Sequence, residues 1–357
     1  MTRAYDTIRV GFIGTGRISD LHAIEYINDP RAQIVALCDR SPQLAKARAT
    51  AWGLQDPFIT DNMHDLLKRP DIDLVEILLP HHLHRSAALA AIAAGKAVSL
   101  QKPMCLTVAE ADEVIAAAEA ADVPFKVFEN FIFYPPVMKA KELIDQGAIG
   151  EPISIRIKSN PGKSKTTWEI PAQAAAWRQK ANEAGGGPLV FDDGHHKFAL
   201  AWHFMGMAES VHAWISHTTA ADGFVFDAPA MISFRFPGKR YGNLEIVYSP
   251  ELLIETKHYA QDDRVEITGT SGIVWINQGH GKLGETAPVQ LYRDGTLTSY
   301  NLMDTGWEWS FVHSTRYHLK ALREGLPIKL TGAEGREILR FATAAEDSAR
   351  AGKAIDL

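Results

Sequence analysis

A glycine-rich turn near the N-terminus has the spacing of a phosphate-binding loop. Its core reads Gly14-x-Gly16-x-x-Ser19, and it begins at the last residue of the apolar segment IRVGFIG and leads into an amphipathic stretch. Glycine allows a tight turn, and backbone N–H groups can then approach a pyrophosphate at a helix N-terminus. Ser19 replaces the usual third glycine or alanine but is small enough for helix–strand packing. The residues expected to contact a dinucleotide here are Gly14, Gly16, Arg17 and Ile18.

An acidic residue follows the next apolar segment, where such proteins contact the ribose. Asp39 ends AQIVALCD, 23 residues after Gly16. A carboxylate there accepts hydrogen bonds from the adenosine ribose and repels a 2′-phosphate, which favours NAD. Arg40 comes next and could pair with a phosphate, so NADP stays open. The alternative is that the glycines only make a turn and Asp39 only caps the next helix.

A parallel sheet would bring these residues to one edge. Apolar segments alternate with helical stretches through the first third of the chain, which predicts a doubly wound α/β sheet. Helix starts are marked by Ser41 with Pro42, and by Thr107 with Glu110 three residues later. We assign residues 1–127 to a dinucleotide-binding Rossmann domain. The predicted strands lie in IRVGFIG, AQIVALCD, IDLVEILLP, AVSLQKP and PFKVFENF.

The pattern changes after about residue 150. Strands now alternate apolar and polar residues and follow one another, with the helical segment HHKFALAWHFMG among them. This predicts an α+β domain over residues 128–357, with an open, mostly antiparallel sheet covered on one face. We expect it to bind substrate and to form a homodimer or homotetramer through the open face. Phe234, Phe236, Tyr248 and Trp275 suggest apolar residues on both faces.

Composition excludes several classes of protein. The 357 residues suit two domains, and a net charge of −6 without a basic run argues against nucleic-acid or membrane partners. Two cysteines in no metal-binding spacing fit a reduced compartment. Without a leader peptide or an apolar stretch of about 20 residues, we expect a cytoplasmic protein. His81, His82 and His84 form a dense group, but no spacing supports a metal site.

Motifs along nearly the whole chain resemble the Gfo/Idh/MocA family of oxidoreductases. The segment LPHHLHRSAALAAIAAGKAVSLQKPM contains Pro80, His84, Gly95-Lys96 and Gln101-Lys102-Pro103. Further similarities are VMKAKELIDQGAIGEPISIRI, Trp177-Arg178, the run Gly185–Gly187, Asp192-x-Gly194-x-His196 and the ending AGKAIDL. The combination is specific, although each motif alone is loose.

The resemblance implies a set of site residues. In the family, a lysine and the Asp and His of such a segment meet at the nicotinamide, which gives Lys102, Asp192 and His196 as catalytic residues. Asp193 and His195 are the alternatives, because the spacing after the glycine run can be aligned one residue differently. Cofactor contacts are expected from Pro80, His84, Gln101 and Lys102. Substrate contacts are expected from Lys102, Trp177, Arg178, Asp192, His195 and His196.

These residue types suit the oxidation of a secondary alcohol. A histidine can take the hydroxyl proton near neutral pH. A lysine ammonium can stabilise the developing alkoxide, and an aspartate can orient the imidazole or the substrate. An aromatic face and a guanidinium, as in Trp177 and Arg178, suit a carbohydrate, although tryptophans more often pack in a core. We therefore predict an NAD(P)-dependent dehydrogenase acting on a sugar, sugar derivative or cyclitol.

Three departures from the family pattern keep other functions open. Gln101 replaces a glutamate beside Lys102, Leu79 and His81 flank Pro80 in place of polar residues, and Ile132 replaces a frequent arginine. One rival is a lyase or glycoside-cleaving enzyme, in which transient oxidation gives no net NADH. The other is a dinucleotide-sensing protein without activity, which would be expected to lack Lys102 or His196.

Overall fold

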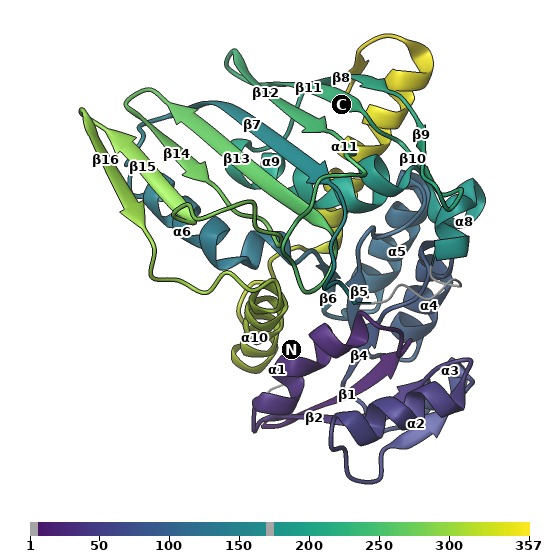
Figure 1. The fold of residues 1–357 in the computed structure, drawn as a ribbon. Helices are drawn as coiled ribbons and strands as arrows, with labels where there is room; N and C mark the ends of the chain where they lie inside the picture. Colours follow the sequence, from purple (N-terminus) through teal and green to yellow (C-terminus); the bar gives the residue numbers. More distant parts are fainter. Residues whose placement is uncertain (1–5, 169–174) are drawn as a thin grey trace. The chain divides into compact units, whose positions relative to one another are not determined.

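The computed structural model describes residues 6–168 and 175–357. The chain divides into two compact units (Figure 1). The first combines Met1–Asn130 with Phe311–Leu339, and the second combines Phe131–Ser310 with Arg340–Leu357. Helices α10 (Glu308–Glu324) and α11 (Gly332–Ala351) contribute residues to both units. The division predicted at residues 127 and 128 stays a prediction.

The first unit contains the predicted parallel sheet. Over the described residues it has six strands in the order β3-β2-β1-β4-β5-β6, all paired in parallel. The strands are β1 (Ile8–Ile13), β2 (Ala32–Cys38), β3 (Phe58–Thr60), β4 (Leu74–Ile77), β5 (Ala97–Gln101) and β6 (Phe125–Phe128). The helices are α1 (Ser19–Asn28), α2 (Pro42–Ala51), α3 (Met63–Leu67), α4 (His84–Ala93) and α5 (Val108–Ala120), with a 3₁₀ turn over His81–Leu83. The doubly wound fold class is therefore confirmed.

Local signals set the helix starts in this unit. Ser41 Oγ accepts from the Leu44 amide at the start of α2, and Thr107 Oγ1 accepts from the Glu110 amide at the start of α5. The short edge strand β3 was not predicted, because three half-buried residues give no periodic pattern. Buried Ile8, Val10, Phe12 and Tyr26 form one core with Leu319 of α10.

The second unit contains the predicted antiparallel sheet. Over the described residues it has nine strands in the order β16-β15-β14-β13-β7-β12-β11-β8-β17, and only β7 and β12 pair in parallel. The strands are β7 (Pro152–Pro161), β8 (Ser210–Ile215), β11 (Ala230–Phe236), β12 (Arg240–Ile246), β13 (Gln261–Gly269), β14 (Gly272–Ile276), β15 (Val289–Arg293), β16 (Thr296–Tyr300) and β17 (Ile355–Asp356), beside a separate ribbon of β9 (Thr218–Thr219) and β10 (Val225–Phe226). The helical segments are α6 (Pro135–Asp145), α8 (Ala181–Ala184) and α9 (Gly194–Met205), with shorter turns over Phe131–Phe133, Trp177–Gln179 and Pro188–Asp193.

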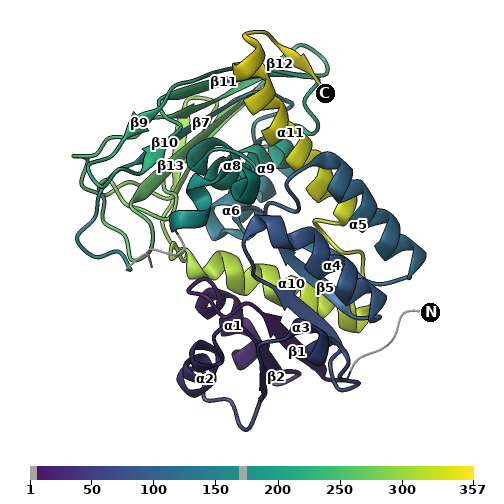
Figure 2. The same cartoon turned by 90° about the vertical axis from the view of Figure 1, so that its right-hand side faces the viewer.

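Helices cover one face of this sheet. Figure 2 shows α6 and α9 on the same side of it. Phe198 of α9 packs against Phe234 and Phe341, at ring-centroid distances of 6.0 and 4.9 Å. Phe234 and Phe236 therefore lie on the covered face of the sheet. Along β11 the outward residues are Met231, Ser233 and Arg235.

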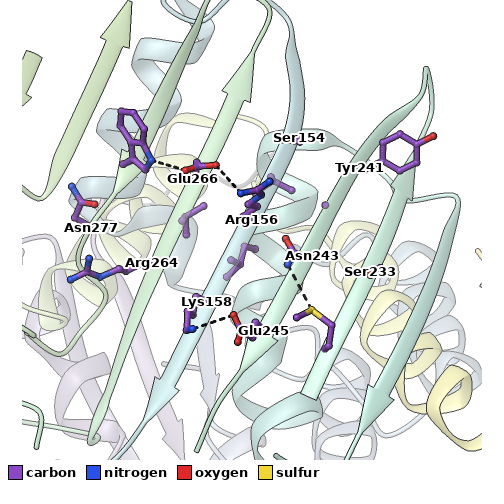
Figure 3. Close-up of a pocket in the computed structure, with 16 residues that line it drawn as sticks. Ser154, Arg156, Lys158, Ser233, Tyr241, Asn243, Glu245, Arg264, Glu266 and Asn277 are labelled. Atoms are coloured by element: carbon purple, nitrogen blue, oxygen red, sulfur yellow. Dashed lines mark hydrogen bonds and ion pairs between the residues drawn. The ribbon is translucent and has the colours of Figure 1, made fainter. Parts of the chain in front are cut away.

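The open face of the sheet is hollowed and lined by polar and charged side chains together with Met231, Tyr241 and Trp275 (Figure 3). Arg156 lies 3.8 Å from Glu266, and Lys158 lies 3.2 Å from Glu245. Tyr241 projects from the same face and is 56% exposed. The residues that line this hollow do not include Lys102, Asp192 or His196. None of the described helices is long and apolar enough to cross a membrane.

Candidate active site

The glycine turn has a geometry that only glycine allows at its first position. Gly14 has a φ of +94°, and a Cβ there would lie 2.3 Å from the Leu78 carbonyl oxygen. A Cβ at Gly16 would meet no atom within 4 Å, so there is open space beside this turn. The buried Ser19 hydroxyl donates to the Gly16 carbonyl oxygen over 2.6 Å at the start of α1. This bond explains how serine replaces the usual small apolar residue.

Asp39 links the end of β2 to the glycine turn. Its Oδ2 accepts from the Thr15 amide and hydroxyl over 2.9 and 3.0 Å, and its Oδ1 accepts from the Ser41 amide over 3.0 Å. The residue that caps α2 is Ser41, not Asp39. The half-buried carboxylate is thus held beside the turn, while Arg40 is exposed.

His84 joins the loop after β4 to the loop that carries Lys102. The imidazole is fully buried, with Nδ1 2.8 Å from the Pro103 carbonyl oxygen and Nε2 2.8 Å from the Leu79 carbonyl oxygen. Pro80 follows Leu79, and both Pro80 and Lys102 are half-buried. His84 therefore contacts the residue before Pro80 and the residue after Lys102, and it helps to hold both predicted site residues in place.

In the second unit, a π-helical turn precedes the predicted catalytic helix. It spans Pro188–Asp193, and the Asp192 amide donates to the Gly187 carbonyl oxygen over 3.0 Å, a bond between residues five apart. A π-turn adds one residue to a helical turn and often occurs at a functional site. The extra residue changes where the side chains that follow lie around the helix axis, so sequence spacing alone could not decide between His195 and His196.

Buried groups hold this turn in place. Asp227 accepts from the Leu189 and Val190 amides over 2.7 and 2.8 Å. Burial raises the pKa of Asp227 to about 6, although both amides favour its carboxylate. A Cβ at Gly187 would lie 1.9 Å from Asp227 Oδ2, and one at Gly186 would lie 2.4 Å from the Phe191 Cβ. The glycine run is therefore required for close packing.

Arg178 and Asp192, predicted as separate site residues, are brought together. Arg178 Nε donates to Asp192 Oδ2 over 2.8 Å, and the guanidinium lies 4.3 Å from the centre of the Trp177 ring. Burial lowers the pKa of Arg178, but the charge of Asp192 outweighs it and leaves that pKa above its usual value. The pair fixes the aspartate carboxylate and presents a guanidinium beside an indole face.

Asp193 belongs to a buried ionic group that sequence reasoning missed. Lys197 is fully buried, and its Nζ lies 2.8 Å from Asp193 Oδ2 and 3.1 Å from Asp263 Oδ2. Gln261 Nε2 donates to both carboxylates over 2.9 and 3.1 Å. Burial lowers the pKa of Lys197, but these two carboxylates raise it above its usual value. The i,i+4 spacing of Asp193 and Lys197 was a local signal, whereas Asp263 comes from a strand distant in sequence.

The two candidate histidines differ in their surroundings. His196 stacks on Phe131, with ring centroids 4.3 Å apart and planes 21° apart, and is 5% exposed. His195 is completely buried. His280 contacts Phe131 edge to face and stacks on Trp307 at 5.0 Å. Burial lowers the pKa of His280 to about 4, so this imidazole is neutral at pH 7.

Further aromatic rings continue from Trp307. Tyr259 lies 5.5 Å from Trp307, His258 lies 5.3 Å from it, and Trp168 contacts both His258 and Tyr259. These residues come from separate loops, so no sequence spacing identified them. The second unit thus places Phe131, His196 and several other rings in one connected series.

Lys102 belongs to the first unit, and Asp192, His195 and His196 belong to the second. Within residues 6–168 and 175–357, no three His, Cys, Asp or Glu side chains converge as metal ligands.

Comparison with known families gives a match for both parts of the chain. Residues 8–129 match the model of an oxidoreductase family with an NAD-binding Rossmann fold, and residues 141–357 match the C-terminal alpha/beta domain of the same family. The chain belongs to the Gfo/Idh/MocA family of oxidoreductases. The predicted family, the fold class and the NAD-binding Rossmann domain are thereby confirmed.

Several curated relatives are named for a sugar or a cyclitol, among them the following two. Levoglucosan dehydrogenase of Pseudarthrobacter phenanthrenivorans is 29% identical over 218 residues, which cover 58% of this chain and 54% of that protein. The chain thus matches little more than half of that relative's length. Myo-inositol 2-dehydrogenase of Thermotoga maritima is 24% identical over 359 residues, covering 98% of both proteins.

Solved structures of other oxidoreductases share the fold over nearly the full length of this chain. A levoglucosan dehydrogenase in complex with NADH and levoglucosan superposes with a TM-score of 0.82 at 22% identity, covering 98% of this chain and 99% of that one. At this identity the likeness establishes the fold alone.

Proposed function

We propose that this protein is an NAD-dependent dehydrogenase that oxidises a secondary hydroxyl of a sugar, sugar derivative or cyclitol. The observation that carries the proposal is the match of both parts of the chain to one oxidoreductase family. Relatives named for levoglucosan and myo-inositol support a polyhydroxylated ring as the substrate.

The glycine turn and Asp39 fit a dinucleotide. The open space beside Gly16 leaves room for a pyrophosphate at the N-terminus of α1, through Gly14, Gly16, Arg17 and Ile18. Thr15 and Ser41 hold the Asp39 carboxylate in place, which supports Asp39 as the residue that contacts the adenosine ribose. When bound, NAD would supply the acceptor for the hydride that leaves the substrate carbon.

Side chains of the protein would remove the hydroxyl proton and stabilise the alkoxide. We assign proton removal from the hydroxyl to His196 and stabilisation of the developing alkoxide to Lys102. Stacking on Phe131 restricts the His196 imidazole to one plane, which keeps its nitrogens in a fixed direction. Asp192, neutralised by Arg178, is suited to accept a hydrogen bond from a second hydroxyl of the substrate.

The connected aromatic rings favour a cyclic substrate. Trp168, Tyr259 and His258 are each partly exposed, and a ring with C–H groups on one face can pack on such side chains. Acidic and basic side chains near them, such as Asp192 and Arg178, can hydrogen-bond hydroxyl groups.

A substrate panel tests this function. Sugars, anhydrosugars, cyclitols and glycosides are incubated with NAD and separately with NADP, and both NADH formation and product structure are followed. We expect NADH to form with at least one polyhydroxylated ring and a ketone to appear in equal amount. Product formation by elimination or glycoside cleavage without NADH would instead establish the rival in which oxidation is transient.

A further inference from the structure

A buried polar cluster in the first unit lies beneath the segment that carries Lys102. Its centre is Glu76 of β4, which pairs with Ser99 of β5 in the sheet register. Glu76, Ser99 and His22 are completely buried, and Tyr26 is 1% exposed. A carboxyl group at such depth requires hydrogen-bond donors on its oxygens, because an unpaired buried charge is strongly unfavourable.

Three side chains supply these donors. His22 Nδ1 lies 2.7 Å from Glu76 Oε1, Tyr26 OH donates to Oε2 over 2.7 Å, and Ser99 Oγ donates to Oε1 over 3.1 Å. Burial and the charge of Glu76 raise the pKa of Tyr26 well above its usual value, so the phenol keeps the proton that it donates. The Phe128 and Phe311 rings lie beside the imidazole, at centroid distances of 4.0 and 5.1 Å.

Gln101 connects this cluster to the backbone of Lys102. The Lys102 amide donates to Gln101 Oε1 over 2.8 Å, and Gln101 Nε2 lies 2.8 Å from His22 Nε2. A backbone N–H can only donate, so the carboxamide oxygen must face Lys102 and the NH₂ group must face His22. His22 Nε2 therefore accepts, and the single proton of the neutral imidazole resides on Nδ1, which donates to Glu76.

We propose that Glu76, His22 and Gln101 are positioning residues that fix the backbone at Lys102 through one directed series of hydrogen bonds. Their role in positioning rests on the proposed function of Lys102 in the dehydrogenase reaction. Each group in the series has one allowed orientation, because every donor faces an acceptor. Glutamine at position 101 makes this possible with a neutral His22. A glutamate at position 101 would place a carboxylate oxygen opposite His22 Nε2. Both atoms are acceptors unless Nε2 binds a proton and His22 becomes an imidazolium.

The first test concerns the protonation of His22 and needs no enzymatic activity. NMR of the protein labelled with ¹⁵N-histidine distinguishes a neutral Nδ1–H imidazole from the Nε2–H form and from imidazolium. In the native protein at neutral pH we expect His22 to carry one proton, on Nδ1. In Gln101→Glu, a change of nearly equal shape, we expect imidazolium. A native His22 with a proton on Nε2 would overturn the proposal.

The second test follows the Lys102 amide itself by hydrogen exchange. Gln101→Met keeps the size of the side chain but removes the acceptor, so exchange at this amide should accelerate by about tenfold or more. Gln101→Glu keeps an acceptor and should restore protection. Thr107→Ala removes an N-cap in the same unit, outside the cluster, and serves as the control for general destabilisation. Unchanged exchange in Gln101→Met would contradict the proposal.

Turnover separates this proposal from the proposed function. With a substrate from the panel, Gln101→Met should lower kcat by about tenfold or more with a smaller change in KM, since misplacement by about 1 Å can cost this much. Thr107→Ala should leave kcat unchanged, and Gln101→Glu, which keeps the acceptor for the Lys102 amide, should recover most of the turnover that Gln101→Met loses. Altered exchange with unaltered kcat would reject positioning for catalysis. A protein that oxidises no panel substrate, yet shows the expected exchange, would reject the proposed function alone.

Discussion

Arg178 Nε donates to Asp192 Oδ2 over 2.8 Å, so a residue predicted to bind substrate and a residue predicted to act in catalysis form one ion pair. The Asp192 side chain is 12% exposed and that of Arg178 is 30% exposed. A carboxylate so little exposed depends on its cation, and the stability of the turn that carries it should depend on Arg178.

Replacing Arg178→Ala should lower the free energy of unfolding by about 1–3 kcal/mol, because it leaves a largely buried carboxylate without its charged donor. The double variant R178A/D192N should be more stable than R178A, since an amide tolerates the loss of the guanidinium better. Urea unfolding of the four proteins measures this coupling. If the loss of unfolding free energy in R178A/D192N equals the sum of the losses in R178A and in D192N, the two residues are not coupled and the interpretation is contradicted.

Asp39 should make the protein prefer NAD over NADP, because its carboxylate repels a 2′-phosphate. Asp39→Asn keeps an acceptor for the Thr15 amide and should lower the ratio of NAD affinity to NADP affinity by about tenfold. Asp39→Ala should lower this ratio as well. Binding titrations with both cofactors provide the measurement. A clear NADP preference in the native protein would refute this prediction.

The open face of the large sheet should form the contact between subunits of a homodimer or homotetramer. Tyr241 projects from this face beside the alternating charges of Arg156, Glu266, Lys158 and Glu245 (Figure 3). Light scattering at micromolar concentration should give at least twice the monomer mass, and Tyr241→Glu should reduce it. Leu302→Glu, at a fully exposed loop residue, is the matched control. A native mass equal to one chain would count against the prediction.

His280 should make stability depend on pH below neutrality. Its pKa is about 4 in the folded protein, against an ordinary value of 6.5. Between these values the unfolded chain binds more protons, so the free energy of unfolding rises with pH from about 4 to 6.5, by up to about 3 kcal/mol. The difference in stability between the native protein and His280→Phe should show this slope. A difference that is flat over that range would show that His280 is not buried as a neutral base.

The sequence was sufficient for features that depend on local spacing. Gly14 and Asp39 follow from a strand, a tight turn and a second strand, which are encoded in about 30 consecutive residues. The contacts of Lys197 with Asp263 were not predictable in this way, because β13 reaches α9 only through the folded sheet. The face occupied by Phe234 could not be predicted, since alternation gives two faces but does not say which one helices cover. The π-turn before Gly194 has no composition signal, because it differs from an ordinary turn by a single residue.

The most direct test of the proposed dehydrogenase follows hydrogen from substrate to cofactor. An active substrate is deuterated at the carbon that bears the reacting hydroxyl, and the NADH formed is analysed for deuterium in the native protein and in variants. We predict one deuterium per ketone produced. We also predict turnover lowered by about 10²-fold or more in Lys102→Ala and in His196→Ala, with a combined effect smaller than the product of the two. NADH free of deuterium, or full turnover in both single variants, would contradict the account. Loss of turnover in His195→Ala but not in His196→Ala would show that His195, and not His196, is the base.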